Sequence, residues 1–171
     1  MLSITRKAAA FAVFLFGALL ASASAAQAQP EFSLRPIDGE AVTSQSLRGE
    51  VAVLAFGASW LPLSRNQMES VKKLADQYAG RGVAVYWVSA DSENPKSKNY
   101  VSDDQLRELA RKYKVTILRD PDGAVSRKLG VDQLPSIVIL DKQGNVAGSI
   151  GGMDPNANLT TQLSARLDKI L

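Results

Sequence analysis

Residues 51–65 read VAVLAFGASWLPLSR, and this stretch decides the fold. Val51 to Phe56 is continuously apolar, as expected of a strand that is buried on both faces of a sheet. From Ser64 to Tyr78 apolar residues recur at i, i+3 and i+4, which predicts an amphipathic helix that ends before Gly80. A short apolar loop, Trp60 to Leu63, therefore joins a buried strand to a long helix.

Strand-like and helix-like patterns continue to alternate on both sides of this stretch. A turn at Asp38-Gly39 predicts a hairpin before it. Further strands are expected at 83–88, 115–118, 137–140 and 146–150, and further helices at 102–113, after Asp122-Gly123, and at 158–171. We therefore predict one α/β domain over residues 29–171, with a mixed central sheet covered by helices on both faces.

The first 28 residues have the pattern of a secretory signal peptide. A basic start, Met1–Lys7, precedes an apolar run from Ala8 to Ala21, and Ala26-Gln27-Ala28 forms an A-x-A cleavage site. Cleavage is expected after Ala28, which would make the protein periplasmic or secreted. An uncleaved membrane anchor is the alternative, but a spanning helix needs about 20 apolar residues, and this run is shorter.

The composition excludes most common catalytic chemistry. The 171 residues include no cysteine and no histidine, so there is no thiolate nucleophile, no Ser-His-Asp relay and no imidazole metal ligand. We expect neither a cofactor nor a metal. The net charge of +3 falls to +1 without Arg6 and Lys7, because 18 basic and 17 acidic residues then remain. Such a balanced charge does not indicate binding to nucleic acid.

Several acidic residues follow the second buried strand. They are expected to form a solvated loop and a helix cap rather than a metal site, because no histidine or cysteine is available to anchor a transition metal. These residues are Asp91, Glu93, Asp103 and Asp104.

Separate landmarks along the chain resemble the thioredoxin fold. They are residues 58–65, Gly130-Val131, Leu134-Pro135-Ser136 and Asp141 to Gly144. The sequence is most similar to the secreted thiol–disulfide oxidoreductases of the TlpA type, over about Phe32 to Leu171. The resemblance implies a periplasmic protein with a thioredoxin fold, an N-terminal β-hairpin and the insertion of that subfamily around 91–118. It also implies that Pro135 is the cis-proline of the family.

The reactive residues of that family are missing from this chain. Leu61 takes the place of the first cysteine, whose thiolate is normally stabilised at the start of a helix, and Ser64 takes the place of the second. Leucine offers no nucleophile, and serine could only cap the helix. Gln67 corresponds to a glutamate of many relatives, and Ala55 to the buried aspartate of thioredoxin. These losses together predict a redox-inactive protein that is not an enzyme.

What remains at this place is apolar. The resemblance puts the Leu134-Pro135 loop beside the Trp60–Leu63 run, and Met153 is expected to border the same groove. Apolar clusters on a surface usually mark binding sites, so we predict a groove that binds extended polypeptide or a protein partner. Its expected residues are Trp60, Leu61, Pro62, Leu63, Leu134, Pro135 and Met153.

Three alternatives stay open at this point. Leu61 and Leu63 could fold inward and merely fill the space left by the thiols. The resemblance also suggests a thiol–disulfide oxidoreductase, although a chain without cysteine cannot form a mixed disulfide. A third possibility is that cysteines were replaced deliberately, but trapping a complex would not require changes at Gln67 and Ala55. We expect the protein to be a monomer.

Overall fold

The computed structural model describes residues 29–154 and 157–171, so the predicted signal peptide at 1–28 lies outside the described residues. Seven strands form one sheet in the order β2-β1-β5-β4-β3-β6-β7. The elements are β1 (Ser33–Pro36), β2 (Val42–Thr43), β3 (Val51–Gly57), α1 (Pro62–Gln77), β4 (Val83–Ser89), α2 (Asp103–Tyr113), β5 (Thr116–Arg119), α3 (Ala124–Lys128), β6 (Ser136–Leu140), β7 (Val146–Gly151) and α4 (Leu159–Leu167).

Strand β3 lies inside the sheet and is buried along its whole length. It pairs in parallel with β4 and antiparallel with β6, so that Ala55 lies between Trp87 and Ile137. Parallel pairing continues from β4 to β5, and antiparallel pairing from β6 to β7 and from β5 to β1. The predicted α/β architecture with a mixed sheet is confirmed, and the N-terminal hairpin is formed by β1 and β2.

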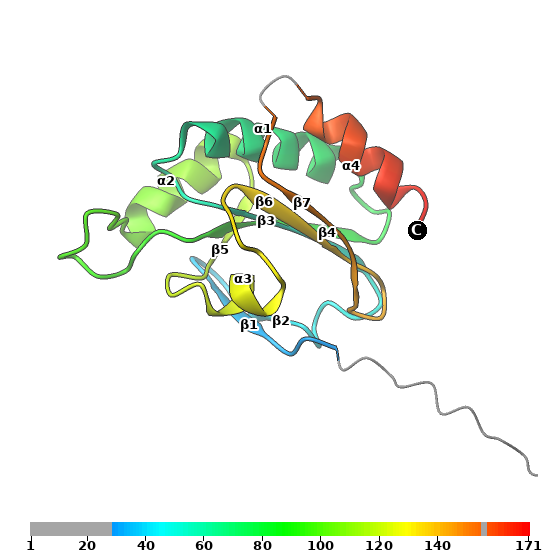
Figure 1. The fold of residues 1–171 in the computed structure, drawn as a ribbon, viewed down its shortest axis with the longest axis horizontal. Helices are drawn as coiled ribbons and strands as arrows, with labels where there is room; N and C mark the ends of the chain where they lie inside the picture. The colour runs from blue at the N-terminus through cyan, green and yellow to red at the C-terminus, as the bar shows by residue number, and fades with distance from the viewer. Residues whose placement is uncertain (1–28, 155–156) are drawn as a thin grey trace, which may run out of the picture.

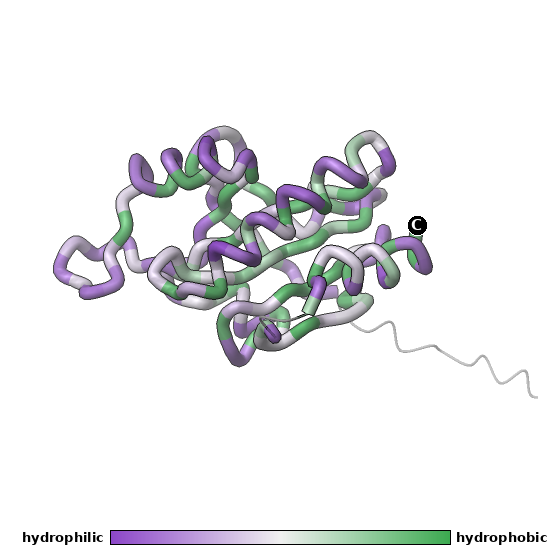
Figure 2. Tube along the Cα trace, turned by 90° about the horizontal axis from the view of Figure 1, so that it is seen from above, coloured by the Kyte–Doolittle hydropathy of each residue, from purple (hydrophilic) through white to green (hydrophobic). Residues whose placement is uncertain are grey.

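Alternate residues of β3 enter two separate cores, because side chains along a strand point to opposite faces of the sheet. Val51, Val53 and Ala55 pack with apolar side chains of α1, α2 and α4. Leu54 and Phe56 pack with α3 and with the N-terminal segment on the other face. Figure 1 shows α1, α2 and α4 along one side of the sheet and α3 on the other side. In Figure 2, hydrophobic (green) segments lie along the strands, and hydrophobic and hydrophilic segments alternate along the helices.

Two helix boundaries differ from the sequence prediction by two residues or more. Helix α1 begins at Pro62 rather than Ser64, since proline suits the first turn of a helix, where its missing N–H has no partner to lose. Helix α4 ends at Leu167 rather than Leu171, and the last residues form a tighter turn in which Ile170 N–H donates to the Leu167 carbonyl. Within residues 29–154 and 157–171, no helix has the length and apolar character needed to cross a bilayer.

Candidate functional site

The start of α1 carries no side-chain cap. Leu61 is the N-cap residue, in extended backbone, and the first turn contains no acidic side chain. The turn is closed by main-chain bonds, with Leu61 N–H donating to the Ala58 carbonyl at 3.0 Å and Ser64 N–H to the Leu61 carbonyl at 3.1 Å. The expectation that Ser64 caps the helix is wrong, because Ser64 is already the third residue of α1.

Ser64 instead faces the interior beneath the loop. It is fully buried, and its Oγ accepts a hydrogen bond from Ala58 N–H at 3.2 Å. The hydroxyl therefore braces the end of β3 against the start of α1. Gly57 makes room for this arrangement: a Cβ there would lie 2.8 Å from Ser64 Oγ and from Gln67 Oε1, which is closer than real contacts allow.

Gln67 is the centre of a buried polar cluster. Its Nε2 donates to the carbonyls of Phe56 at 3.3 Å and Ser136 at 3.0 Å, and its Oε1 accepts from Trp87 Nε1 at 2.9 Å. One amide thus ties α1 to β3, β6 and β4. An ionised carboxylate could accept the indole N–H but could not donate to the two carbonyls, so this environment suits glutamine and disfavours glutamate.

Four positions hold reactive residues in the resembled family and are degenerate in this chain. The fourth of these, Ala55, is fully buried in the core under α1. Together with Leu61, Ser64 and Gln67, it leaves no ionisable group at the positions that carry the chemistry of the resembled family. Each of these positions is now apolar or neutral and, where polar, hydrogen-bonded. The arrangement has no general acid, no base and no nucleophile for disulfide exchange.

A groove of about 420 Å³ lies outside this neutral interior. Trp60, Leu61 and Leu134 come together in its wall, and Trp60 is 55% exposed while both leucines are half-buried. The Leu134–Pro135 peptide bond is cis. The other described lining residues are Ala90, Asp120, Pro121, Gly123, Ser126, Val131, Asp132 and Gln133.

The other predicted groove residues lie elsewhere around the start of α1. Pro62 is exposed, Leu63 is half-buried and Pro135 is buried, and none of them is among the described lining residues. Met153 is half-buried and packs against the core beneath α1 and α4. The structure therefore gathers three of the seven predicted residues into the wall, and Leu61 faces the groove instead of filling the interior.

Asp91 supports this site in a way that the sequence did not reveal. It was expected to be solvated, but it is fully buried. Its carboxylate accepts from Ser59 N–H at 3.0 and 3.1 Å, from Ser59 Oγ at 3.0 Å and from Ser89 Oγ at 2.8 Å. Because Ser59 immediately precedes Trp60, Asp91 fixes the backbone on which the exposed indole stands.

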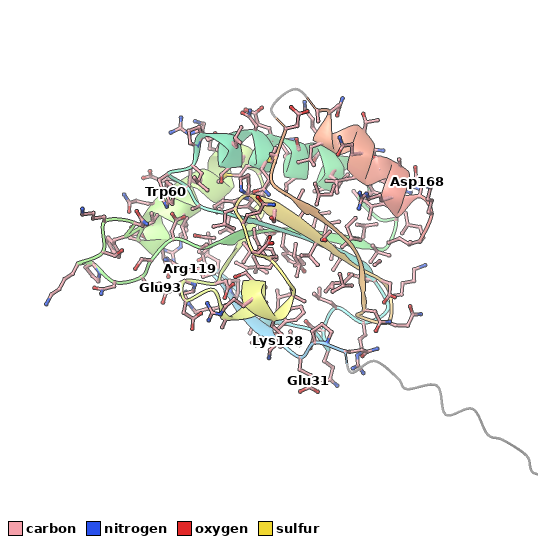
Figure 3. All side chains as sticks on the ribbon, in the orientation of Figure 1. Glu31, Trp60, Glu93, Arg119, Lys128 and Asp168 are labelled. Carbon is pink, nitrogen blue, oxygen red and sulfur yellow. The ribbon has the colours of Figure 1, made fainter. Side chains whose placement is uncertain are left out.

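A network of two arginines and two acids holds the segment after Asp91. Arg119 is only 2% exposed, and its guanidinium donates to the carbonyls of Asp91 at 3.3 Å and Val101 at 3.0 Å and to Asp103 Oδ1 at 2.6 Å. Its Nε lies 3.0 Å from Glu93 Oε1, an ion pair without hydrogen-bond geometry. Figure 3 shows Trp60, Arg119 and Glu93 toward the same end of the molecule.

Arg35 on β1 completes the network. It pairs with Glu93 and, at 3.0 Å, with Asp103. The hydrogen bond from Arg35 is the main cause of the lowered pKa of Asp103, and the same contact raises the pKa of Arg35. No group of acidic side chains within the described ranges is arranged to hold a metal ion. Sequence reasoning missed this network because Arg35, Asp103 and Arg119 are far apart in the chain.

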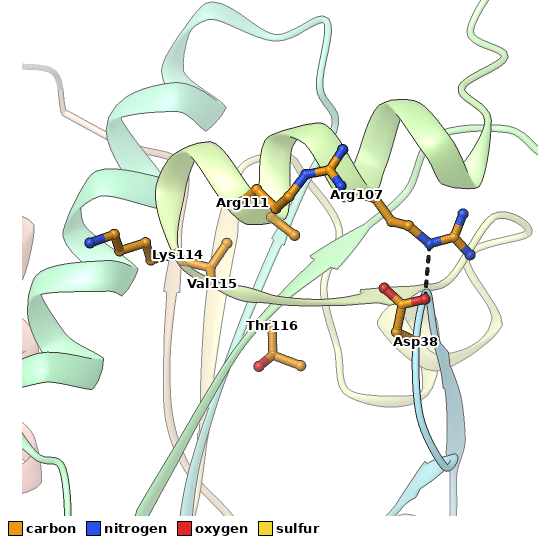
Figure 4. A pocket seen from close by; sticks show the side chains of 7 residues that line it. Asp38, Arg107, Arg111, Lys114, Val115 and Thr116 are labelled. Carbon is orange, nitrogen blue, oxygen red and sulfur yellow. Dashed lines mark hydrogen bonds and ion pairs between the residues drawn. The ribbon is translucent and has the colours of Figure 1, made fainter.

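A second hollow, of about 400 Å³, lies at the C-terminal end of α2 and is lined by basic residues (Figure 4). Arg107 is held by Asp38, with 2.9 Å between Arg107 Nε and Asp38 Oδ1. Arg111 stands in the last turn of α2, and Lys114 follows as its C-cap. Positive charge near a helix C-terminus complements the carbonyl dipoles there, so these residues have a structural explanation.

The fold and the loop together define a thioredoxin-like protein whose reactive residues are absent. Residues 25–149 match the AhpC/TSA family, and the chain belongs to that family. The fold class and the resemblance to the thioredoxin-like superfamily are thereby confirmed.

Two curated relatives and one solved structure illustrate the similarity. The thioredoxin-like protein YneN of Bacillus subtilis is 33% identical over 69% of this chain and 66% of its own length. The thiol:disulfide interchange protein DsbE of Pseudomonas aeruginosa is 30% identical over 94% of this chain and 88% of its own. The structure of MTB dsbF, in mixed oxidised and reduced forms, superposes with a TM-score of 0.64 at 26% identity, covering 82% of this chain and 95% of that one.

Proposed function

We propose that this chain is a periplasmic, redox-inactive member of the family that captures an extended polypeptide segment without covalent chemistry. The capture site is the groove with Trp60, Leu61 and Leu134 in its wall. The proposal is carried by one observation: the groove has an open, apolar wall, while the positions that hold the reactive residues in the family are neutral in this chain.

The main chain of the groove supports an extended occupant. Leu134 lies in the wall, and neither its N–H nor its carbonyl makes a hydrogen bond within the described residues. An extended segment can pair with such free main-chain groups while its side chains enter neighbouring apolar pockets. Trp60 and Leu61 offer the apolar contact, and burying them against a ligand removes their surface from water.

The proposed location rests on the pattern of residues 1–28. Export would bring the protein into an oxidising compartment, where a cysteine-free groove could hold substrates of thiol enzymes without reacting with them. We propose that the mature protein acts there as a monomer.

The direct test is binding of a reduced and alkylated model protein, which stays unfolded and carries no free thiol. Binding to the wild type is measured by calorimetry and compared with Leu61→Asp, which puts a charge in the groove. Val146→Asp is the matched control, since Val146 is 44% exposed on β7 and is not among the lining residues. We expect Leu61→Asp to lose at least about ten-fold in affinity, and Val146→Asp to bind like the wild type. Equal binding by all three proteins would overturn the proposal.

The rival function is thiol–disulfide oxidoreduction, as in the interchange protein among the relatives. Disulfide exchange needs an attacking thiolate, and this chain has no cysteine. The purified protein should therefore not reduce a disulfide substrate above the buffer rate. Any turnover that survives removal of contaminating thioredoxin would favour the rival.

Introducing cysteines at positions 61 and 64 tests whether the loop still has the backbone geometry of a disulfide-forming site. In the double variant Leu61→Cys/Ser64→Cys, the first sulfur would stand at the N-cap and the second at the third helical residue. We expect a disulfide to form in air and to add reductase activity. Failure to form it in a folded protein would show that the loop backbone has also been remodelled.

A further inference from the structure

The groove has a charge as well as an apolar wall. Two carboxylates, Asp120 and Asp132, are among its described lining residues, and none of these lining residues is a lysine or an arginine. The two acids come from different parts of the chain, one from the turn after β5 and the other from the loop before β6. Their surroundings differ sharply.

The carboxylate of Asp120 is already hydrogen-bonded within the protein. It is 3% exposed, and its two carboxylate oxygens accept from Val125 N–H at 3.0 Å and Ser126 N–H at 2.7 Å. These bonds satisfy the free N–H groups at the start of α3. Asp120 is therefore part of the framework and is not free to pair with a ligand.

Asp132 is free within the described structure. Its side chain is exposed and makes no hydrogen bond or ion pair with any described residue. Its two neighbours are held in place, because Val131 N–H donates to the Ser126 carbonyl at 2.8 Å and Ser136 Oγ donates to the Gln133 carbonyl at 2.7 Å. The loop thus presents one unpaired carboxylate from an anchored backbone.

The arginine of α3 does not neutralise this charge. Arg127 donates to the Asp122 carbonyl at 2.8 Å, and its guanidinium lies beside Gly123. It makes no ion pair with Asp132, and it is not among the described lining residues. The groove therefore combines an apolar wall with a single available negative charge.

We propose that the captured segment carries a lysine or arginine beside an apolar residue, and that Asp132 selects it. The apolar side chain would contact Trp60, Leu61 and Leu134, and the cation would pair with Asp132. This inference rests on the proposed function and adds the class of segment. A charge at the rim contributes modestly to affinity, but it favours basic segments and rejects acidic ones through like-charge repulsion.

The test uses three extended peptides that are identical except at one position beside an apolar residue, which is lysine, glutamine or glutamate. Dissociation constants are measured by calorimetry at low salt for the wild type, Asp132→Asn and Asp132→Lys. Asp122→Asn serves as the matched control, because Asp122 is also exposed but is not among the lining residues of the groove.

For the wild type we expect the lysine peptide to bind about three-fold more tightly than the glutamine peptide and about ten-fold more tightly than the glutamate peptide. Asp132→Asn should remove the difference, Asp132→Lys should reverse it, and Asp122→Asn should keep it. Raising the salt should weaken binding of the lysine peptide alone, since an exposed pair is screened.

The outcomes separate this inference from the proposed function. If the glutamine peptide binds, Leu61→Asp abolishes that binding and the charge of the peptide has no effect, the capture function stands and the role of Asp132 is refuted. If the charge preference persists in Asp132→Asn, Asp132 is not its source, and the inference is refuted. If no peptide binds to the wild type, both proposals are refuted.

Discussion

The N-termini of α1 and α2 differ in how they are capped. Each helix begins with backbone N–H groups that have no partner inside the helix. In α2, Ser102 and Gln105 form a capping box, and Asp103 and Asp104 follow in the first turn. In α1, the N-cap residue is Leu61, with no capping side chain and no acid in the first turn.

The difference shows where each helix finds its support. The N–H groups at the start of α2 are capped by residues three positions apart in the sequence, and Asp103 adds ion pairs to Arg35 and Arg119. The start of α1 is held from a distance: Gln67 binds carbonyls of β3 and β6, and Asp91 binds the residue before Trp60. In α2 the capping side chains cover the helix start. In α1 the supporting groups lie in the interior, so the apolar side chain of Leu61 stays available at the helix start and lines the groove.

The largest expected effect comes from breaking the buried support of α1 with Gln67→Glu. Burial raises the pKa of the introduced carboxyl, so the folded state binds more protons than the unfolded state, and stability falls as the pH rises above about 4.3. At pH 7 the free energy of unfolding should be about 3 kcal/mol below that of the wild type. Urea unfolding at pH 4 and pH 7 measures this change.

The matched control for that experiment is Gln67→Leu, which removes the same hydrogen bonds without adding a charge. It should cost about 2 kcal/mol at both pH values. Wild-type stability of Gln67→Glu at pH 7 would mean that the cluster accommodates a carboxylate, contrary to the hydrogen-bond geometry.

Asp91→Ala should have the next largest effect. It leaves Ser59 N–H and the hydroxyls of Ser59 and Ser89 without their acceptor, at a cost of about 2 kcal/mol. Hydrogen exchange at residues 58–61 should accelerate, because the backbone before Trp60 loses its anchor. Glu108→Ala removes an exposed acid on α2 that makes no hydrogen bond or ion pair with a described residue, and it should change neither quantity by much. Equal effects of the two variants would show that Asp91 does not hold the loop.

Removing the cap of α2 and adding one to α1 should change the free energy of unfolding in opposite directions. Ser102→Ala removes the side-chain cap of α2 and should lower the free energy of unfolding by about 1 kcal/mol. Leu61→Ser supplies the cap that α1 lacks and should raise it by up to about 1 kcal/mol, while weakening polypeptide binding. Thermal unfolding and calorimetry test both points. A loss of stability in Leu61→Ser would mean that Leu61 contributes more by packing than an N-cap would.

The smallest effect concerns the ion pair at the start of α2. Arg35 lowers the pKa of Asp103, so the carboxylate stabilises the fold above its unfolded pKa, and this contribution is lost as the pH falls through the folded value. Asp103→Asn should therefore lower stability by under about 1 kcal/mol at pH 6, and by almost nothing at pH 2. Asp104→Asn is the control, since it also removes an acid from the first turn but lies outside the Arg35 network. A pH-independent effect of Asp103→Asn would contradict the assignment.

The prediction from sequence succeeded where the signal is local or periodic. The apolar run at Val51 to Phe56 and the helical spacing after Ser64 gave the buried strand and the amphipathic helix, and the acidic residues at 103 and 104 were expected at the cap of a helix. It failed at Asp91, whose polar neighbours indicated a solvated loop. Nothing near Asp91 in the chain shows that Ser59, 32 positions earlier, would bring its N–H group to the carboxylate.

The sequence by itself determined that this protein has no thiol and no imidazole, and that its helices and strands alternate, because composition and periodicity are properties of the chain alone. It also placed neutral residues at the four degenerate positions. Only the tertiary structure decided that Leu61 faces the groove, that Gln67 joins three strands and that Asp120 is occupied while Asp132 is free. Those facts depend on which distant groups meet, and a buried polar group is defined by the partners that the fold brings to it.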